Sequence, residues 1–117
     1  THVGITPAYR GVHGGYWALW RNDAANFGVT IHSVDEGVDT GHVVAQVRTM
    51  PTSRDNFSTY PLLQQAASLP ALKALLSNRE RLRGSGDLSP NVSQEVGRQW
   101  YHPTIWQYAS GLLRGIK

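Results

Sequence analysis

Two short stretches of the chain hold residue types that could exchange protons. His2 lies in THVGITPAYRG, and His32 leads into the acidic turn DEGVDTG, which holds Asp35, Glu36 and Asp39. An imidazole beside a carboxylate can exchange protons near neutral pH, because its ordinary pKa is about 6.5. The carboxylate orients the ring and stabilises its charged form. These residue types therefore predict a general acid–base site.

Each of these residues also has a purely structural interpretation. His32 is compatible with a partly buried strand residue, and Asp35 with a residue that caps its own turn. Gly37 and Gly41 let a backbone approach a ligand closely, but they also serve loop geometry alone. Residue types alone therefore indicate a histidine–carboxylate site without naming its reaction.

The elements that would position these residues follow from hydrophobic spacing. Glycine and proline predict a loop over residues 1–14, and apolar spacing predicts a helix over 15–28 whose Trp pair packs in the core. β-Branched residues predict antiparallel strands at 29–34 and 42–49 on either side of the acidic turn. Two strands make a thin core, so the predicted fold class is α/β, as part of a larger domain.

The second half of the chain is predicted to be mainly helical. The spacing of apolar residues predicts a helix over residues 57–78. One face of this helix is expected to pack on the rest of the protein through Leu62, Ala66, Leu69, Leu72 and Leu76. Pro70 predicts a kink or a new helix start, because proline lacks the N–H donor. Residues 102–115 predict a closing helix with four buried side chains, Ile105, Trp106, Leu112 and Leu113.

Composition narrows the class of protein. The 117 residues are 40% apolar and 16% charged, as in an ordinary globular domain, and include no cysteine for disulfides or thiolate metal sites. The net charge is +3, and the basic run NRERLRGSG predicts a solvated helix end in preference to a phosphate contact. No apolar run approaches the roughly 18 residues of a membrane span. We expect a cytoplasmic protein.

The two motifs around His2 and Asp39 resemble those of the formyltransferase family that uses 10-formyltetrahydrofolate. The family's first motif, N-x-H-x-S-L-L-P with a Y-R-G tail, matches HVGITPAYRG from its histidine onward. The second, G-V-T-[IL]-x-x-x-D-x-G-x-D-x-G, matches GVTIHSVDEGVDTG, whose second Asp in the acidic turn is Asp39. The likeness is dense over residues 1–49 and looser beyond them.

The resemblance implies an enzyme that transfers a formyl group from 10-formyltetrahydrofolate to a primary amine, without a metal. His2 would be the acid–base group and oxyanion partner, and Asp39 would hold and tune it. The loop that carries Asp39 would contact the pterin, largely through backbone groups of Glu36, Gly37, Val38 and Asp39 itself.

The motifs leave the acceptor amine open. An amino-sugar nucleotide is slightly preferred over methionyl-tRNA, because the Y-R-G tail occurs in sugar-modifying members. Arg10 would hold an anionic part of the acceptor, or form only a structural salt bridge. His13, His32 and His42 lie near the motifs without an assigned role.

Departures from the family pattern predict a truncated, divergent member. The family's catalytic Asn would precede Thr1, GIT replaces S-L-L, and HGG at 13–15 replaces a proline-containing stretch. We expect the C-terminal half of a Rossmann-like formyltransferase catalytic domain at 1–83, a linker at 84–99 and a closing helix at 100–117. Its partner would be the missing N-terminal half of the same domain.

Two other functions remain open from the sequence. A non-catalytic binding module or inactive fragment would fit the missing Asn and the thin core. A metal-dependent hydrolase would use His2, His32, His42 and Asp39, which are suitable Zn²⁺ ligands but match no metalloprotease spacing.

Overall fold

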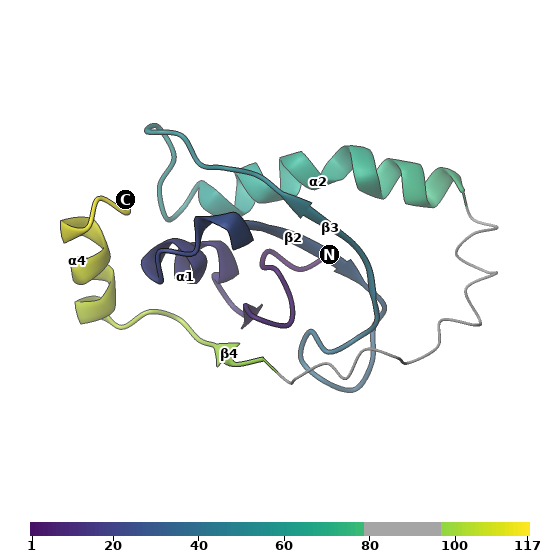
Figure 1. Ribbon diagram of the computed structural model, residues 1–117, viewed down its shortest axis with the longest axis horizontal. Helices are drawn as coiled ribbons and strands as arrows, with labels where there is room; N and C mark the ends of the chain where they lie inside the picture. The colour runs from purple at the N-terminus through teal and green to yellow at the C-terminus, as the bar shows by residue number, and fades with distance from the viewer. Residues whose placement is uncertain (79–96) are drawn as a thin grey trace.

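The chain folds into a small α/β structure with two short sheets (Figure 1). The computed structural model describes residues 1–78 and 97–117. Its elements are, in order, β1 (Arg10–Gly11), α1 (Gly14–Trp20), the 3-10 turn η1 (Ala24–Asn26), β2 (Gly28–His32), β3 (Val43–Arg48), α2 (Tyr60–Ser77), β4 (Gln99–Trp100) and α4 (Ile105–Leu113). Within these two ranges, no helix is long and apolar enough to cross a membrane.

The antiparallel pair predicted around the acidic turn is confirmed as β2 and β3. Gly28 pairs with Arg48, and the register shifts at the end of β2, where His32 pairs with Val43. An irregularity of this kind bends a strand and turns its side chains. The side chain of His32 therefore points in a different direction from the one it would take in a regular strand, shortly before the acidic turn begins.

A second, parallel pair joins β1 to β4, where the sequence predicted a loop and a linker. Gly11 pairs with Trp100, and its φ of +91° suits glycine. A Cβ at Gly11 would meet the carbonyl oxygen of Trp100, so the close approach requires glycine. Each strand has only two residues, too few for an alternating pattern. Residues 84–96 of the predicted 84–99 linker, and the basic run apart from its first residue, lie outside the described residues.

Helix α2 covers the β2–β3 pair as one continuous helix, with Pro70 inside it (Figure 1). A new helix start at Pro70 is therefore wrong, while the predicted kink stays a prediction. The face that packs on the sheet is also not the leucine row. Its buried residues are Tyr60, Gln64 and Ser68, spaced by four.

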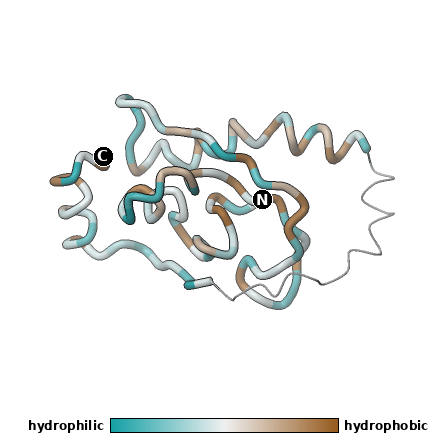
Figure 2. The backbone as a smooth tube through the Cα atoms, viewed as in Figure 1, coloured by the Kyte–Doolittle hydropathy of each residue, from teal (hydrophilic) through white to brown (hydrophobic). Residues whose placement is uncertain are grey.

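The leucine row of α2 is exposed because a polar contact fixes the helix rotation. Gln64 donates a hydrogen bond from Nε2 to the Gly28 carbonyl at 2.6 Å. This contact leaves three leucines mostly exposed, at 69, 59 and 54%: Leu62, Leu69 and Leu76. Figure 2 shows hydrophobic residues distributed along the whole helix, so its hydropathy does not identify the buried face.

The core is mainly aromatic and lies between α1, the start of α2 and β4. Its buried rings are Tyr9, Tyr16, Trp17, Phe27, Tyr60 and Trp100. Trp17 is 3% exposed and Trp20 packs against the cluster, which confirms the predicted core role of this pair. Large rings that stack edge-on or offset can bury much area in a small chain.

Helix α4 packs on this core through the Tyr108 ring and through small and polar residues. The Tyr16 hydroxyl donates to the Gln107 carbonyl at 3.0 Å, and Trp20 Nε1 donates to Ser110 Oγ at 3.1 Å. Gly111 lies against the Tyr16 ring with no room for a side chain. The prediction that the apolar residues of this helix are buried is wrong for all four: Ile105, Trp106, Leu112 and Leu113 are exposed.

A histidine pair joins α1 to the segment that leads into α4. His13, the N-cap of α1, has φ 57°, and its Nε2 lies 2.9 Å from Nδ1 of His102. The His13 ring also packs on Phe57, with centroids 4.5 Å apart. One imidazole must donate and the other accept, so this hydrogen bond requires at least one neutral ring.

Acid should weaken this junction. Burial, and then the charge of His102, lower the pKa of His13 from its ordinary 6.5. The unfolded chain therefore binds more protons than the folded one just below pH 6.5, so stability falls as the pH drops through that window. In the wild type, the urea concentration at the midpoint of unfolding should fall between pH 7.5 and pH 5. We expect this fall to be smaller in His13→Gln. His42→Gln, at an exposed histidine, is the control. An unchanged pH difference in His13→Gln would contradict this assignment.

Candidate active site

The buried His2 is held in place by backbone pairing with β2. Its N–H donates to the Thr30 carbonyl at 2.8 Å, and the Thr30 N–H donates to the His2 carbonyl at 2.9 Å. The Thr30 hydroxyl then donates to the Gly4 carbonyl at 2.8 Å and accepts from the Thr6 N–H at 3.0 Å. One fully buried threonine thus fixes the whole histidine loop. Residue types did not single out this role for Thr30.

Glycines allow this loop to approach α1. A Cβ at Gly4 would meet the Tyr9 carbonyl and crowd the His2 ring, and a Cβ at Gly14 would lie 2.8 Å from the Val3 carbonyl oxygen. Neither site has space for a side chain. The histidine loop and the start of α1 therefore form one closely packed unit.

Asp39 lies beside His2 at the end of the acidic turn. It adopts a left-handed conformation, with φ 52°, and its side chain is 19% exposed. Its Oδ2 accepts from the Gly11 N–H at 2.9 Å and lies 3.3 Å from His2 Nδ1. Its Oδ1 lies 3.5 Å from His32 Nε2. The fold therefore brings His2, His32 and Asp39 together, with Gly11 as an additional donor.

Backbone carbonyls determine which ring nitrogens carry protons. His2 Nε2 lies 2.7 Å from the Tyr9 carbonyl oxygen, and His32 Nδ1 lies 2.7 Å from that of Ser33. A carbonyl only accepts, so each of these nitrogens donates its N–H. The other nitrogen of each ring faces Asp39, with a lone pair when the ring is neutral and an N–H when it is protonated. The charge of Asp39 therefore stabilises the charged form of His2.

Opposing effects act on the pKa of His2. Burial lowers it below the ordinary 6.5 and is the largest effect, while the hydrogen bond to Tyr9 and the charge of Asp39 raise it. A charge on His32 lowers it again, since the two ring centroids are 6.4 Å apart. The carboxylate thus favours a proton on His2, while a charged His32 would oppose it. Such a group can accept and return a single proton.

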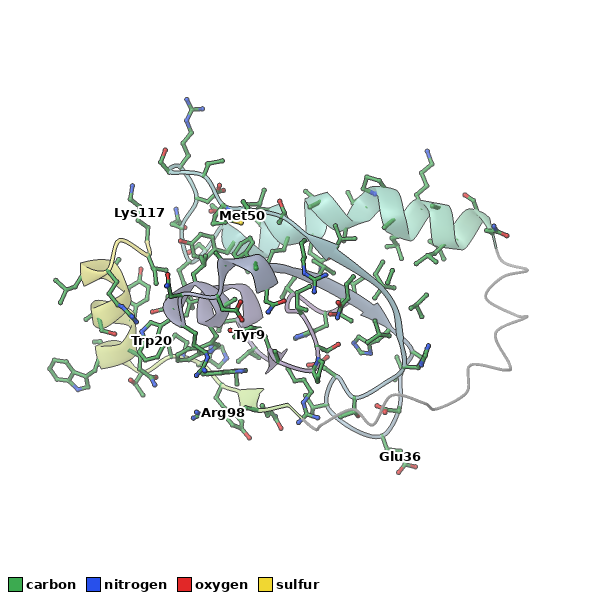
Figure 3. The ribbon with its side chains drawn as sticks, in the orientation of Figure 1. Tyr9, Trp20, Glu36, Met50, Arg98 and Lys117 are labelled. Carbon is green, nitrogen blue, oxygen red and sulfur yellow. The ribbon has the colours of Figure 1, made fainter. Side chains whose placement is uncertain are left out.

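The acidic turn has its own internal structure. Asp35 accepts from the Gly37 N–H at 3.2 Å and from Thr40 Oγ1 at 2.8 and 2.9 Å. Asp35 therefore caps its own turn, as its structural interpretation predicted. Glu36 extends away from the body of the protein (Figure 3), and Val38 is half exposed. The backbone around these residues is accessible to a ligand.

Arg10 is unusual because its guanidinium is buried. The residue is only 8% exposed, and its Nε has no hydrogen-bond partner among the described residues. In residues 1–78 and 97–117, both ion pairs involve Asp39 and neither involves Arg10. The structural salt bridge considered for Arg10 thus has no partner in these parts of the chain.

The metal-site alternative gains no geometric support. His42 is exposed, and its carbonyl rather than its ring pairs with the Ser33 N–H. Across the part of the chain that the structure describes, no group of three His, Cys, Asp or Glu residues is arranged to hold a metal ion.

Known proteins match this chain over the same residues. A family model described as formyl transferase matches residues 1–65. A methionyl-tRNA formyltransferase of a Synechococcus strain is 33% identical over 89% of this chain and 30% of its own length. One from Prochlorococcus marinus is 31% identical over 71% and 24%. The trifunctional purine biosynthetic protein adenosine-3 of Drosophila melanogaster is 32% identical over 80% and 7%.

The matched region contains the whole histidine–carboxylate site. Residues 1–65 include His2, His32, Asp39 and the Gly11 donor, and they account for more than half of the chain. The chain spans less than a third of the length of the curated relatives it matches. By this match and this site, the chain belongs to the formyl transferase family.

Proposed function

We propose that the intact protein transfers a formyl group from 10-formyltetrahydrofolate to a primary amine, with His2 and Asp39 at the reacting centre. The contact between His2 Nδ1 and Asp39 Oδ2 carries this proposal. The described fold would form part of a Rossmann-like catalytic domain, in keeping with the family match over residues 1–65.

Formyl transfer requires one proton to move from the amine to the folate nitrogen. The amine nitrogen bonds to the formyl carbon while the bond from that carbon to the folate nitrogen breaks. The amine loses a proton, and the folate nitrogen gains one. Because Nε2 donates to the Tyr9 carbonyl, Nδ1 of neutral His2 would take the amine's proton at the edge of the ring that Asp39 faces. The charged ring, stabilised by Asp39, would stabilise the oxyanion through its charge and return the proton from Nδ1 to the leaving nitrogen.

The surrounding residues would bind the two substrates. The accessible backbone of Glu36, Gly37, Val38 and Asp39 would contact the pterin. Arg10, buried and without a partner in the described residues, would bind an anionic group of a substrate. Excluding water from a charged contact of this kind strengthens it.

We propose methionyl-tRNA as the acceptor. Relatives that cover 89 and 86% of this chain carry the name methionyl-tRNA formyltransferase, while the purine biosynthetic protein covers 80%. The slight preference for an amino-sugar nucleotide gains no support from the relatives described above. The acceptor would then present an aminoacyl amine at His2, attached to the end of an RNA.

Asp39→Asn should reduce formyl transfer by about 10²-fold to 10⁴-fold, the contribution typical of acid–base catalysis. Its amide cannot stabilise the charged imidazole as a carboxylate does. The measurement is formylation of methionyl-tRNA by the intact protein with 10-formyltetrahydrofolate, with circular dichroism as a check of folding. Asp55→Asn, in the turn before α2, loses a carboxylate elsewhere and should keep full activity.

Wild-type turnover by Asp39→Asn would remove Asp39 from this role. Folate binding without transfer by the wild type would favour the non-catalytic alternative.

His32→Gln should reduce kcat less than His2→Gln does, by under about 10²-fold. Because a charge on His32 lowers the pKa of His2, removing it should move the acid limb of the kcat profile to higher pH. Measuring kcat between pH 5 and 9 tests this sign. A limb that stays in place or moves to lower pH would show that His32 does not act through His2.

A further inference from the structure

Three arginine side chains lie over two tryptophan rings on the side of the protein formed by α1, β4 and α4. The guanidinium of Arg98 lies 4.8 Å from the Trp100 ring centroid, and that of Arg21 lies 5.6 Å from it. Arg114 lies 5.3 Å from the ring of Trp20. We call these five residues the arginine–tryptophan ridge. Each contact falls within the roughly 6 Å range of cation–π attraction.

The ridge is continuous because its rings are linked through Trp17. The Trp17 centroid is 4.9 Å from that of Trp100 and 5.7 Å from that of Trp20. Figure 3 shows the labelled Trp20 and Arg98 at the same end of the molecule as α4. The arginines thus come from three separate elements but are supported by one aromatic stack.

The positive charge of the ridge is not neutralised by the described residues. All three arginines are exposed, and within residues 1–78 and 97–117 none of them forms a salt bridge. Residues 97–117 contain Arg98, Arg114 and Lys117 but no Asp or Glu. Asp23, two residues from Arg21, adds one negative charge near the ridge, but it forms no salt bridge with Arg21. Exposed, oriented guanidiniums without carboxylates are suited to bind phosphate.

The ridge lies next to strand β1, which contacts Asp39 at the proposed reacting centre. Trp100 pairs with Gly11, whose N–H holds Asp39, and its carbonyl accepts from the Val12 N–H at 3.0 Å. An acceptor with its amine at His2 could therefore extend across β1 and reach the ridge. Resting on the proposed function, we infer that the arginine–tryptophan ridge binds backbone phosphates of the RNA that carries the acceptor amine.

Arginines spread over three elements fit a polymer of phosphates better than one compact anion. Each phosphate contact releases counterions, so binding should weaken with salt, with a log–log slope of about −0.7 to −0.9 per contact. The proposal thus specifies an RNA partner and a measurable salt dependence. Residues 97–117, which carry two of the three arginines, lie beyond the family match at 1–65.

The test compares Arg21→Ala/Arg98→Ala with Arg54→Ala, which removes an exposed arginine from the turn before α2. In the intact protein we expect the double variant to raise the KM for methionyl-tRNA about tenfold, leave kcat unchanged and reduce the salt slope of tRNA binding by about two. Arg54→Ala should match the wild type. The matched pair Arg21→Lys/Arg98→Lys retains the charge and should keep the wild-type salt slope.

Other outcomes separate this inference from the proposed function. An unchanged KM and slope in a folded double variant would overturn the ridge assignment, even if the wild type formylates methionyl-tRNA. A wild type that formylates no amine would contradict the proposed function, while direct tRNA binding would still test the ridge. A changed KM for a small phosphate-bearing amine, with tRNA binding unaffected, would show that the ridge binds a compact phosphate and would also overturn the RNA assignment.

Discussion

The carboxylate of Asp39 joins three segments that are distant in sequence. One oxygen accepts from Gly11 on β1 and faces His2, and the other faces His32 at the end of β2. A carboxylate that is largely withdrawn from water must be compensated by donors, and here two of its three neighbours are titratable rings. The left-handed backbone at Asp39 costs some free energy, and the contacts of its side chain offset that cost. The position of the acidic turn thus depends on the same contacts that would perform the chemistry.

The rest of the described fold holds the residues that contact Asp39 in position. Thr30 fixes the histidine loop against β2, and Gln64 on α2 holds the opposite end of that strand through Gly28. The parallel β1–β4 pair places the Gly11 N–H, and the aromatic core packs beneath β1. Polar anchors, rather than apolar rows, determine how α2 and α4 are rotated. Such anchors give specific geometry because an unpaired buried polar group is costly.

Much of the histidine–carboxylate cluster could be predicted from sequence, because two motifs contained His2 and Asp39. His2 and Asp39 were identified from spacing and resemblance, and the antiparallel pair from β-branched residues flanking a glycine-rich turn. Thr30 and Gly11 were not found as positioning groups, since a buried hydroxyl and a backbone N–H leave no pattern in residue types. The buried faces of α2 and α4 were misassigned for a related reason. Leucines and tryptophans marked apolar rows, but Gln64 and the small residues around Gly111 decided which face packs.

The central claim is that Asp39 stabilises the protonated form of His2, whose Nε2 donates to the Tyr9 carbonyl. The most direct measurement is a pH titration of ¹⁵N-labelled histidine side chains by NMR, in the wild type and in Asp39→Asn. We expect neutral His2 to carry its proton on Nε2, and its pKa to fall further in the variant, because the charge that raises it is removed. A neutral His2 protonated on Nδ1, or a His2 pKa unchanged by Asp39→Asn, would contradict the account.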